Sequence, residues 1–157
     1  MSAATRPWLI TGGAGYIGAH VVRELTRRGV PVVVYDDLST GLRSRVADVP
    51  VVVGSVLDEP LLTATLREHG VAGVMHLAAH KQVSESMTAP LRYYRDNIDG
   101  LRAVLSAMQQ AGVDRIVYTS SAAVYGENAG RVTERSDCLP ANPYGVTKLV
   151  GEWMLRD

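Results

Sequence analysis

The sequence predicts an α/β fold built on a doubly wound parallel sheet, and three observations support this prediction. Short β-branched runs alternate with longer segments of helical period, which is the pattern of βαβ units. Runs such as VVVY and VVV are apolar on both faces, as expected of central strands covered by helices on either side. A glycine-rich turn lies between the first run and the first helical segment, where doubly wound sheets place one.

The individual elements follow from the spacing of apolar residues. The expected strands are five short runs: Trp8–Thr11, Pro31–Tyr35, Val51–Val53, Gly73–His76 and Arg115–Thr119. Three longer segments have helical spacing: Tyr16–Arg28, Glu59–Glu68 and Thr88–Ala111. Gly29, Gly70 and Gly112 follow these segments, where a left-handed residue ends a helix. The composition of Glu127–Asn142 predicts a surface loop.

Length and composition limit the classes of function. The 157 residues suffice for one domain, so residues 1–157 are expected to form a single domain. Lys and Arg number 16 against 16 Asp and Glu, which argues against a nucleic-acid or anionic-membrane partner. No apolar stretch is long enough to span a bilayer, and the N-terminus lacks a secretory pattern. With Cys138 as the single cysteine, we expect a soluble, cytoplasmic protein.

The glycine-rich turn predicts a dinucleotide-binding site. In WLITGGAGYIGAH, Gly13, Gly15 and Gly18 satisfy G-x-G-x-x-G, and Thr11, Gly12, Gly15 and Gly18 satisfy the related T-G-x-x-G-x-x-G. Glycines at these positions permit the tight turn and the close approach of a pyrophosphate to the backbone, while the helix start offers free N–H groups. A glycine-rich turn that binds no nucleotide is the alternative explanation.

An acidic pair at the end of the second predicted strand favours NAD as the nucleotide. Asp36 and Asp37 lie about twenty residues beyond the glycines, where an acid accepts hydrogen bonds from the adenosine ribose hydroxyls. A 2′-phosphate would face two like charges there, so NAD is expected rather than NADP. Arg43 and Arg45 follow closely and are the residues that would favour NADP instead.

Four further residues suggest acid–base chemistry. Ser120 and Ser121 follow the last predicted strand, at the edge where open α/β sheets place their ligands. Tyr144 and Lys148, at i and i+4, share one face of a helix that begins at Pro143. A tyrosine pKa of about 10 falls when a cation lies nearby, so Tyr144 can take a proton from a substrate hydroxyl. In isolation, Tyr-x-x-x-Lys is also explained by a tyrosine packed on a lysine stem.

Taken together, these motifs resemble the extended short-chain dehydrogenase/reductases, and among them the UDP-glucose 4-epimerases. The match covers nearly the whole chain, and the supporting stretches are TGGAGYIGAH, DDLSTG, HLAAHKQVSESMTAPLRYYRDNIDG, SSAAVYG and PYGVTK. Related sugar-nucleotide dehydratases carry an Asp-Glu pair where this chain has Ala122 and Ala123, which argues against dehydration. The resemblance implies that NAD oxidises C4 of a UDP-hexose, that the 4-keto sugar rotates, and that the hydride returns to the other face.

The resemblance also implies roles for individual residues. Tyr144 is the expected base, Lys148 lowers its pKa and holds the nicotinamide ribose, and Ser121 orients the C4 oxygen. The expected cofactor-binding residues are Gly12, Gly15, Tyr16, Ile17, Gly18, Asp36, Asp37, Ser39, Thr40, Gly41, Ser55, Val56, Leu77, Ala78, Ala79, Lys81, Asn97, Ser120, Tyr144 and Lys148. Ser55 replaces an Asp that usually contacts the adenine amino group, so a weaker contact is expected. No metal is expected, and His76 and His80 are taken as structural.

The length leaves the function of this chain open between three hypotheses, since members of the family it resembles are roughly twice as long. In the first hypothesis, the chain is part of a UDP-hexose 4-epimerase and is missing the last strands of the sheet and the C-terminal sugar-nucleotide domain. In the second, it is an NAD-binding module without turnover. The third possibility is another NAD-dependent epimerase or reductase acting on a sugar nucleotide. The resemblance further implies a homodimer formed through the Thr88–Ala111 helix and the Tyr144/Lys148 helix.

Overall fold

The computed structural model describes residues 6–127 and 130–157, which form two compact units. Unit 1 comprises the residues up to Ala78 together with Ala103–Thr119, and unit 2 comprises Ala79–Arg102 and the residues from Ser120 onward. The single domain expected over residues 1–157 stays a prediction.

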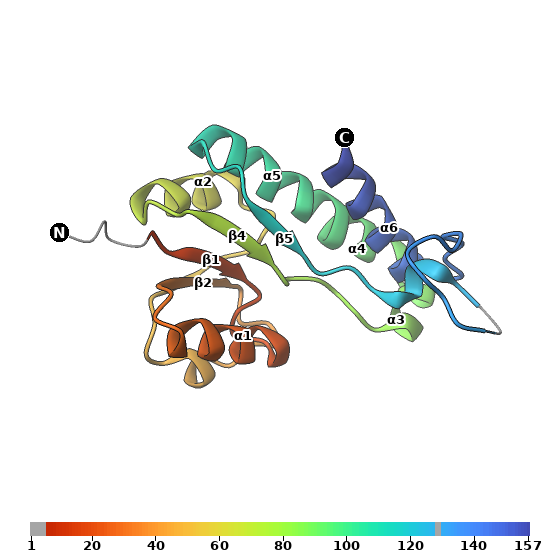
Figure 1. Ribbon diagram of the computed structural model, residues 1–157, viewed down its shortest axis with the longest axis horizontal. Coiled ribbons are helices and arrows are strands. Elements are labelled where there is room, and N and C mark those ends of the chain that lie inside the picture. Colours follow the sequence, from red (N-terminus) through yellow and green to blue (C-terminus); the bar gives the residue numbers. More distant parts are fainter. Residues whose placement is uncertain (1–5, 128–129) are drawn as a thin grey trace. The chain divides into compact units, whose positions relative to one another are not determined.

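Unit 1 contains a sheet of five parallel strands (Figure 1). The strands are β1 Trp8–Thr11, β2 Val32–Asp36, β3 Val51–Val53, β4 Gly73–His76 and β5 Ile116–Tyr118. Their order is β3-β2-β1-β4-β5. The chain thus adds β2 and β3 on one side of β1, and then β4 and β5 on the other side. This confirms the predicted doubly wound parallel sheet. The strand order reverses between β1 and β4, at the carboxyl edge where such sheets bind ligands.

Helices cover both faces of this sheet. On one face, α1 Tyr16–Arg27 and the 3₁₀ turn η1 Arg43–Val46 pack on a cluster that includes Ile10 and Val34. On the other, α2 Glu59–Glu68 and residues 103–111 of α5, Gly100–Ala111, pack on a cluster that includes Leu9 and Val33. Neighbouring strand residues thus enter opposite cores, as the two-sided apolar runs predicted.

The helix ends match the sequence signals. Gly29, Gly70 and Gly112 have φ values of 72°, 58° and 68°, which confirms their prediction as left-handed residues after three helices. The carboxylate of Asp58 accepts a hydrogen bond from the Leu61 amide at 3.0 Å and caps the start of α2. Local sequence therefore sets where the helices of unit 1 begin and end.

The single helix predicted over Thr88–Ala111 is wrong. The structure has α3 Val83–Thr88, α4 Pro90–Tyr93, a π-helical turn η2 Tyr94–Asp99, and only then α5. Ala89 has φ −133° and ψ 53°, because the residue before a proline is driven out of the helical conformation. Pro90 was the signal for this break.

Two further elements complete unit 2. They are the 3₁₀ turn η3 Ala122–Tyr125 and the helix α6 Pro143–Arg156, which begins at Pro143 as predicted. Between them, the described part of the expected loop, Glu127 and residues 130–142, contains no helix or strand; residues 128 and 129 lie outside the described residues. None of the helices in the described ranges has the length and apolarity needed to cross a membrane.

Candidate functional site

The glycine-rich turn of unit 1 has space for glycine alone at two of its positions. Gly12 has φ 69°, and a Cβ there would lie 2.7 Å from the Ala78 amide nitrogen. A Cβ on Gly18 would overlap the carbonyl oxygen of Gly12. A side chain is excluded at both positions because Gly12 packs against the residues that follow β4 and Gly18, in α1, packs against Gly12.

The start of α1 is suited to phosphate. Gly15 is its N-cap, and no side chain in the described part of the protein caps it. The amides of Tyr16, Ile17 and Gly18 occupy the first turn, where N–H groups lack acceptors within the helix. Tyr16 and Ile17 are 68% and 52% exposed. Backbone N–H donors at the positive end of a helix suit the pyrophosphate of a dinucleotide, and binding of the cofactor here stays a prediction.

Asp36 shapes this turn directly. Its Oδ2 atom accepts a hydrogen bond from the Ala14 amide at 2.9 Å, and its Oδ1 atom accepts one from the Leu38 amide at 2.9 Å. The side chain is buried. A Cβ on Gly41 would lie 2.7 Å from Oδ1, so the loop after β2 closes tightly over the acid. The carboxylate thus connects the predicted adenosine loop to the predicted phosphate turn.

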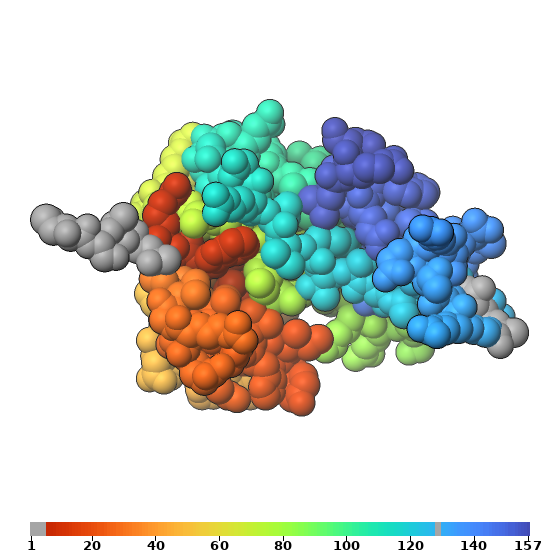
Figure 2. Space-filling model, viewed as in Figure 1, coloured from red at the N-terminus to blue at the C-terminus, as the bar shows by residue number. Residues whose placement is uncertain are grey.

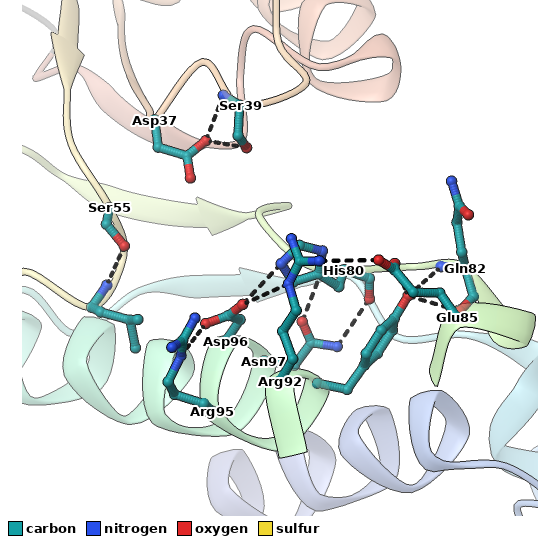
Figure 3. A network of polar contacts seen from close by, with 12 residues as sticks. Asp37, Ser39, Ser55, His80, Gln82, Glu85, Arg92, Arg95, Asp96 and Asn97 are labelled. Atoms are coloured by element: carbon teal, nitrogen blue, oxygen red, sulfur yellow. Dashed lines mark hydrogen bonds and ion pairs between the residues drawn. The ribbon is translucent and has the colours of Figure 1, made fainter. Parts of the chain in front are cut away.

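The other predicted adenosine residues lie on exposed loops after β2 and β3. Asp37 Oδ1 accepts hydrogen bonds from the Ser39 amide at 2.9 Å and the Ser39 hydroxyl at 2.6 Å (Figure 3). Thr40 is exposed, and Val56 is half-buried. Ser55 Oγ accepts from the Leu57 amide at 3.2 Å, which leaves its proton available for donation.

The sequence reasoning missed the contact between Thr11 and His76. Thr11 Oγ1 accepts from the amides of Leu77 at 3.2 Å and Ala78 at 3.4 Å. It also lies 2.8 Å from His76 Nδ1, within hydrogen-bond distance. These bonds hold the predicted nicotinamide-side residues Leu77 and Ala78 against the end of β1. The T-G-x-x-G-x-x-G match was the available signal for Thr11.

In unit 2, Ser121 is held as a hydrogen-bond donor. It is the N-cap of η3, and its Oγ accepts from the Ala123 amide at 3.2 Å. The hydroxyl proton therefore remains available for a ligand oxygen. Its neighbour Ser120 donates instead to the Glu152 carboxylate.

Tyr144 and Lys148 lie in the first turns of α6. Asn142 Oδ1 accepts from the Gly145 amide at 2.8 Å and caps the helix beside Tyr144. Lys148 Nζ lies 6.0 Å from the centre of the Tyr144 ring. Lys148 is only 4% exposed, and this burial lowers its pKa to about 8. The helix thus places a cation beside the predicted base.

Asn97 connects the segment after β4 to the Tyr/Lys helix, and its bonds to His80 are drawn in Figure 3. Its Oδ1 accepts from the His80 amide at 2.8 Å, and its Nδ2 donates to the His80 carbonyl at 3.0 Å and to Thr147 Oγ1 at 3.0 Å. Thr147 lies between Tyr144 and Lys148. The π turn also directs Asp96 to the ring of His80, with Oδ2 2.9 Å from Nε2. Asn97 is buried and holds main-chain groups, beyond its predicted cofactor role.

Tyr93 is a second residue that sequence reasoning missed. It is fully buried, and its hydroxyl accepts from the Gln82 amide at 3.0 Å and lies 2.8 Å from Glu85 Oε2. Burial, with the adjacent Glu85 carboxylate, raises its pKa to about 12. Its ring meets that of Tyr144 edge-to-face, with centroids 6.5 Å apart. The stretch HLAAHKQVSESMTAPLRYYRDNIDG, which supports the family resemblance, was the signal that pointed to this region.

The remaining predicted residues lie at the ends of the same segments. Ala79 is half-buried and Lys81 is exposed, both next to His80 in unit 2. Within the described ranges, no group of His, Cys, Asp and Glu is arranged to hold a metal ion. Cys138 is a free cysteine.

The geometry of both units agrees with comparisons to known proteins. A UDP-glucose 4-epimerase of Azospirillum brasilense is 46% identical over 158 residues, covering 99% of this chain and 45% of its own. The crystal structure of the enzyme from Stenotrophomonas maltophila with bound NAD and formylated UDP-arabinopyranose has a TM-score of 0.94 at 41% identity. It covers 97% of this chain and 48% of its own.

Another solved structure extends this agreement. UDP-glucose 4-epimerase from Brucella ovis in complex with NAD has a TM-score of 0.94 at 38% identity, covering 97% of this chain and 47% of its own. The chain thus spans about half the length of the curated relatives it matches. A family model, described as the NAD dependent epimerase/dehydratase family, matches residues 8–157. With its glycine turn, acidic strand end and Tyr/Lys helix in place, this chain belongs to the NAD dependent epimerase/dehydratase family.

Proposed function

We propose that this chain is the NAD-binding and acid–base part of a UDP-hexose 4-epimerase that interconverts UDP-glucose and UDP-galactose. The observation that carries the proposal is the buried Lys148 ammonium, 6.0 Å from the ring centre of Tyr144 on one helix. Burying a lysine ammonium raises the free energy of the folded state. Such a costly group beside a tyrosine is typical of a site that transfers protons.

The residues of unit 1 fit the adenosine and pyrophosphate of NAD. The amides of the first turn of α1 meet the phosphates, and Asp36 and Asp37 exclude a 2′-phosphate by charge. The glycines at positions 12 and 18 leave this surface free of side chains. NAD, when bound, accepts a hydride from C4 of the sugar and returns it.

The residues of unit 2 fit the proton transfer that accompanies this step. Tyr144 takes the proton of the C4 hydroxyl, and Ser121 donates a hydrogen bond to the same oxygen because its acceptor site already serves Ala123. The Lys148 charge favours negative charge on the phenol oxygen during transfer. On the return step Tyr144 gives the proton back, so the phenol is regenerated.

The test is NADH formation when the chain with NAD is mixed with UDP-galactose. We expect absorbance of NADH, and conversion to UDP-glucose, that Tyr144→Phe reduces by at least about a hundredfold because general acid–base catalysis is lost. NAD binding that persists without any reduction by a sugar nucleotide would identify an NAD-binding module instead. Turnover of UDP-glucuronate, and not of UDP-galactose, would identify a different sugar-nucleotide reaction.

We also propose that the protein acts in the cytoplasm as a homodimer that uses α6 and the segment from Thr88 to Ala111. Leu91 is 80% exposed and Trp153 is 47% exposed, and the final turns of α6 (dark blue) form open surface in Figure 2. A second copy would cover these apolar side chains. Sedimentation of the unmodified chain and of Leu91→Asp tests this: a dimer that the substitution dissociates supports the proposal, and a monomer in both contradicts it.

A further inference from the structure

Two of the contacts between the segment Ser120–Ala123 and α6 lie on opposite sides of Lys148. The Ser120 hydroxyl donates to Oε1 of Glu152. Glu152 lies one helical turn after Lys148 and two turns after Tyr144, so the three residues follow one another along one face of α6. At the start of α6, a Cβ on Gly145 would lie 2.6 Å from the Ala123 carbonyl oxygen, so η3 packs directly on the helix backbone beside Tyr144.

The first of these contacts involves the residue directly before Ser121. Ser121 has an extended backbone, with φ −153° and ψ 147°, so the side chains of Ser120 and Ser121 point to opposite sides. Fixing the hydroxyl of Ser120 therefore fixes the side to which the hydroxyl of Ser121 points. A carboxylate accepts only, and its bond to a hydroxyl is charge-assisted and directional.

We propose that Glu152 is a positioning residue, which holds Ser120 so that Ser121 keeps a constant place relative to Tyr144. This inference rests on the proposed function for its meaning in catalysis. The structural part of the inference does not depend on the reaction. Without the Ser120–Glu152 bond, the segment keeps its packing of Ala123 on Gly145 but loses the hydrogen bond that holds Ser120 to α6. Glu152 acts through Ser120, and it does not touch the reacting atoms.

Amide hydrogen exchange measures this positioning without turnover. The amides of Ala123 and Val124 donate to Oγ and to the carbonyl oxygen of Ser121, at 3.2 Å and 3.1 Å. In Glu152→Ala and in Ser120→Ala we expect both amides to exchange about tenfold faster, the factor that loss of one such hydrogen bond produces. The double substitution should add nothing further, because either one removes the same bond.

Matched variants separate this bond from a general loss of stability. Glu152→Gln keeps an acceptor oxygen of the same reach and should stay within about threefold of the unmodified chain. Glu134→Ala removes an exposed carboxylate from the loop before α6 and should change neither amide. Unchanged exchange at Ala123 and Val124 in Glu152→Ala would overturn the proposal, as would equal acceleration at Leu149 within α6. If Glu152→Ala fails to fold, Ser120→Ala and Glu152→Gln test the same hydrogen bond, because exchange at Ala123 and Val124 should accelerate in the first and stay nearly unchanged in the second.

The catalytic consequence is a separate measurement. With UDP-galactose, Glu152→Ala should lower kcat about tenfold while KM and the Kd for NAD stay unchanged, and Glu152→Gln should restore most of the rate. A rise in KM or in the Kd for NAD instead would contradict a positioning role. If the unmodified chain forms no NADH, the proposed function fails, and the exchange experiment still decides whether Glu152 positions Ser121.

Discussion

The Asp36 carboxylate accepts a hydrogen bond from the Ala14 amide at 2.9 Å, so the end of β2 is joined directly to the glycine-rich turn. Its other oxygen holds the Leu38 amide at 2.9 Å, and Leu38 adopts φ 59°, a conformation unfavourable for a leucine. The acid therefore builds the turn that receives the phosphates, besides its predicted contact with the adenosine ribose.

Replacing this acid should weaken both folding and NAD binding. In Asp36→Asn, one oxygen becomes an NH₂ group that faces a backbone N–H, so we expect a loss of about 2 kcal/mol in the free energy of unfolding. The Kd for NAD should rise at least about tenfold. Urea unfolding and calorimetric titration measure the two effects. Asp37→Asn is the control, because that exposed side chain keeps its oxygen for Ser39 and should change stability little. Unchanged NAD affinity in Asp36→Asn would contradict this account.

Gly18→Ala should abolish NAD binding, since the new methyl group overlaps the Gly12 carbonyl oxygen and displaces the turn. We expect the Kd for NAD to rise by more than about a hundredfold. Gly29→Ala is the control: it has φ 72° with open space around it, so strain costs about 1 kcal/mol of stability while NAD binding is kept. Equal NAD affinity in the two variants would show that the turn tolerates the methyl group.

The stability of the chain should rise with pH above about 8 because of Lys148. Burial lowers its pKa from 10.5 to about 8, so between these values the unfolded state binds a proton that the folded state has released. The free energy of unfolding then increases with pH, by up to about 3 kcal/mol in total. Lys148→Met should lack this part of the pH dependence. Urea unfolding of both chains across this range gives the difference, and parallel curves would contradict the burial effect.

Asn97→Asp should be strongly destabilising. A carboxylate there would face the His80 carbonyl oxygen and Thr147 Oγ1, both of which now accept from Asn97 at 3.0 Å. An unpaired buried charge costs about 3–5 kcal/mol in the free energy of unfolding. The neighbouring Asp96→Asn makes the reverse change at a partly exposed ion pair with Arg95 and should cost below about 1 kcal/mol. Thermal unfolding compares them; a similar cost for both would show that Asn97 tolerates the charge.

Sequence patterns predicted the strands of unit 1 to within about a residue, because each apolar run is short and β-branched residues dominate it. They failed over Thr88–Ala111, where apolar spacing hid the break at Ala89 and the π turn at Tyr94–Asp99. Pro90 marked the first break. The π turn has no local signal, since it is the turn in which Asp96 and Asn97 both bind His80.

By itself, the sequence determined the order of the five strands, the glycines of the phosphate turn, and the Tyr144/Lys148 pair. These are local properties, set by backbone freedom and by spacing along one helix. Only the tertiary structure decided which hydrogen bonds the polar side chains make. Asn97 and Thr147 are 50 residues apart, and Asp36 and Ala14 are 22 apart. Such pairs meet because packed elements bring them together, and no pattern in either segment encodes the partner.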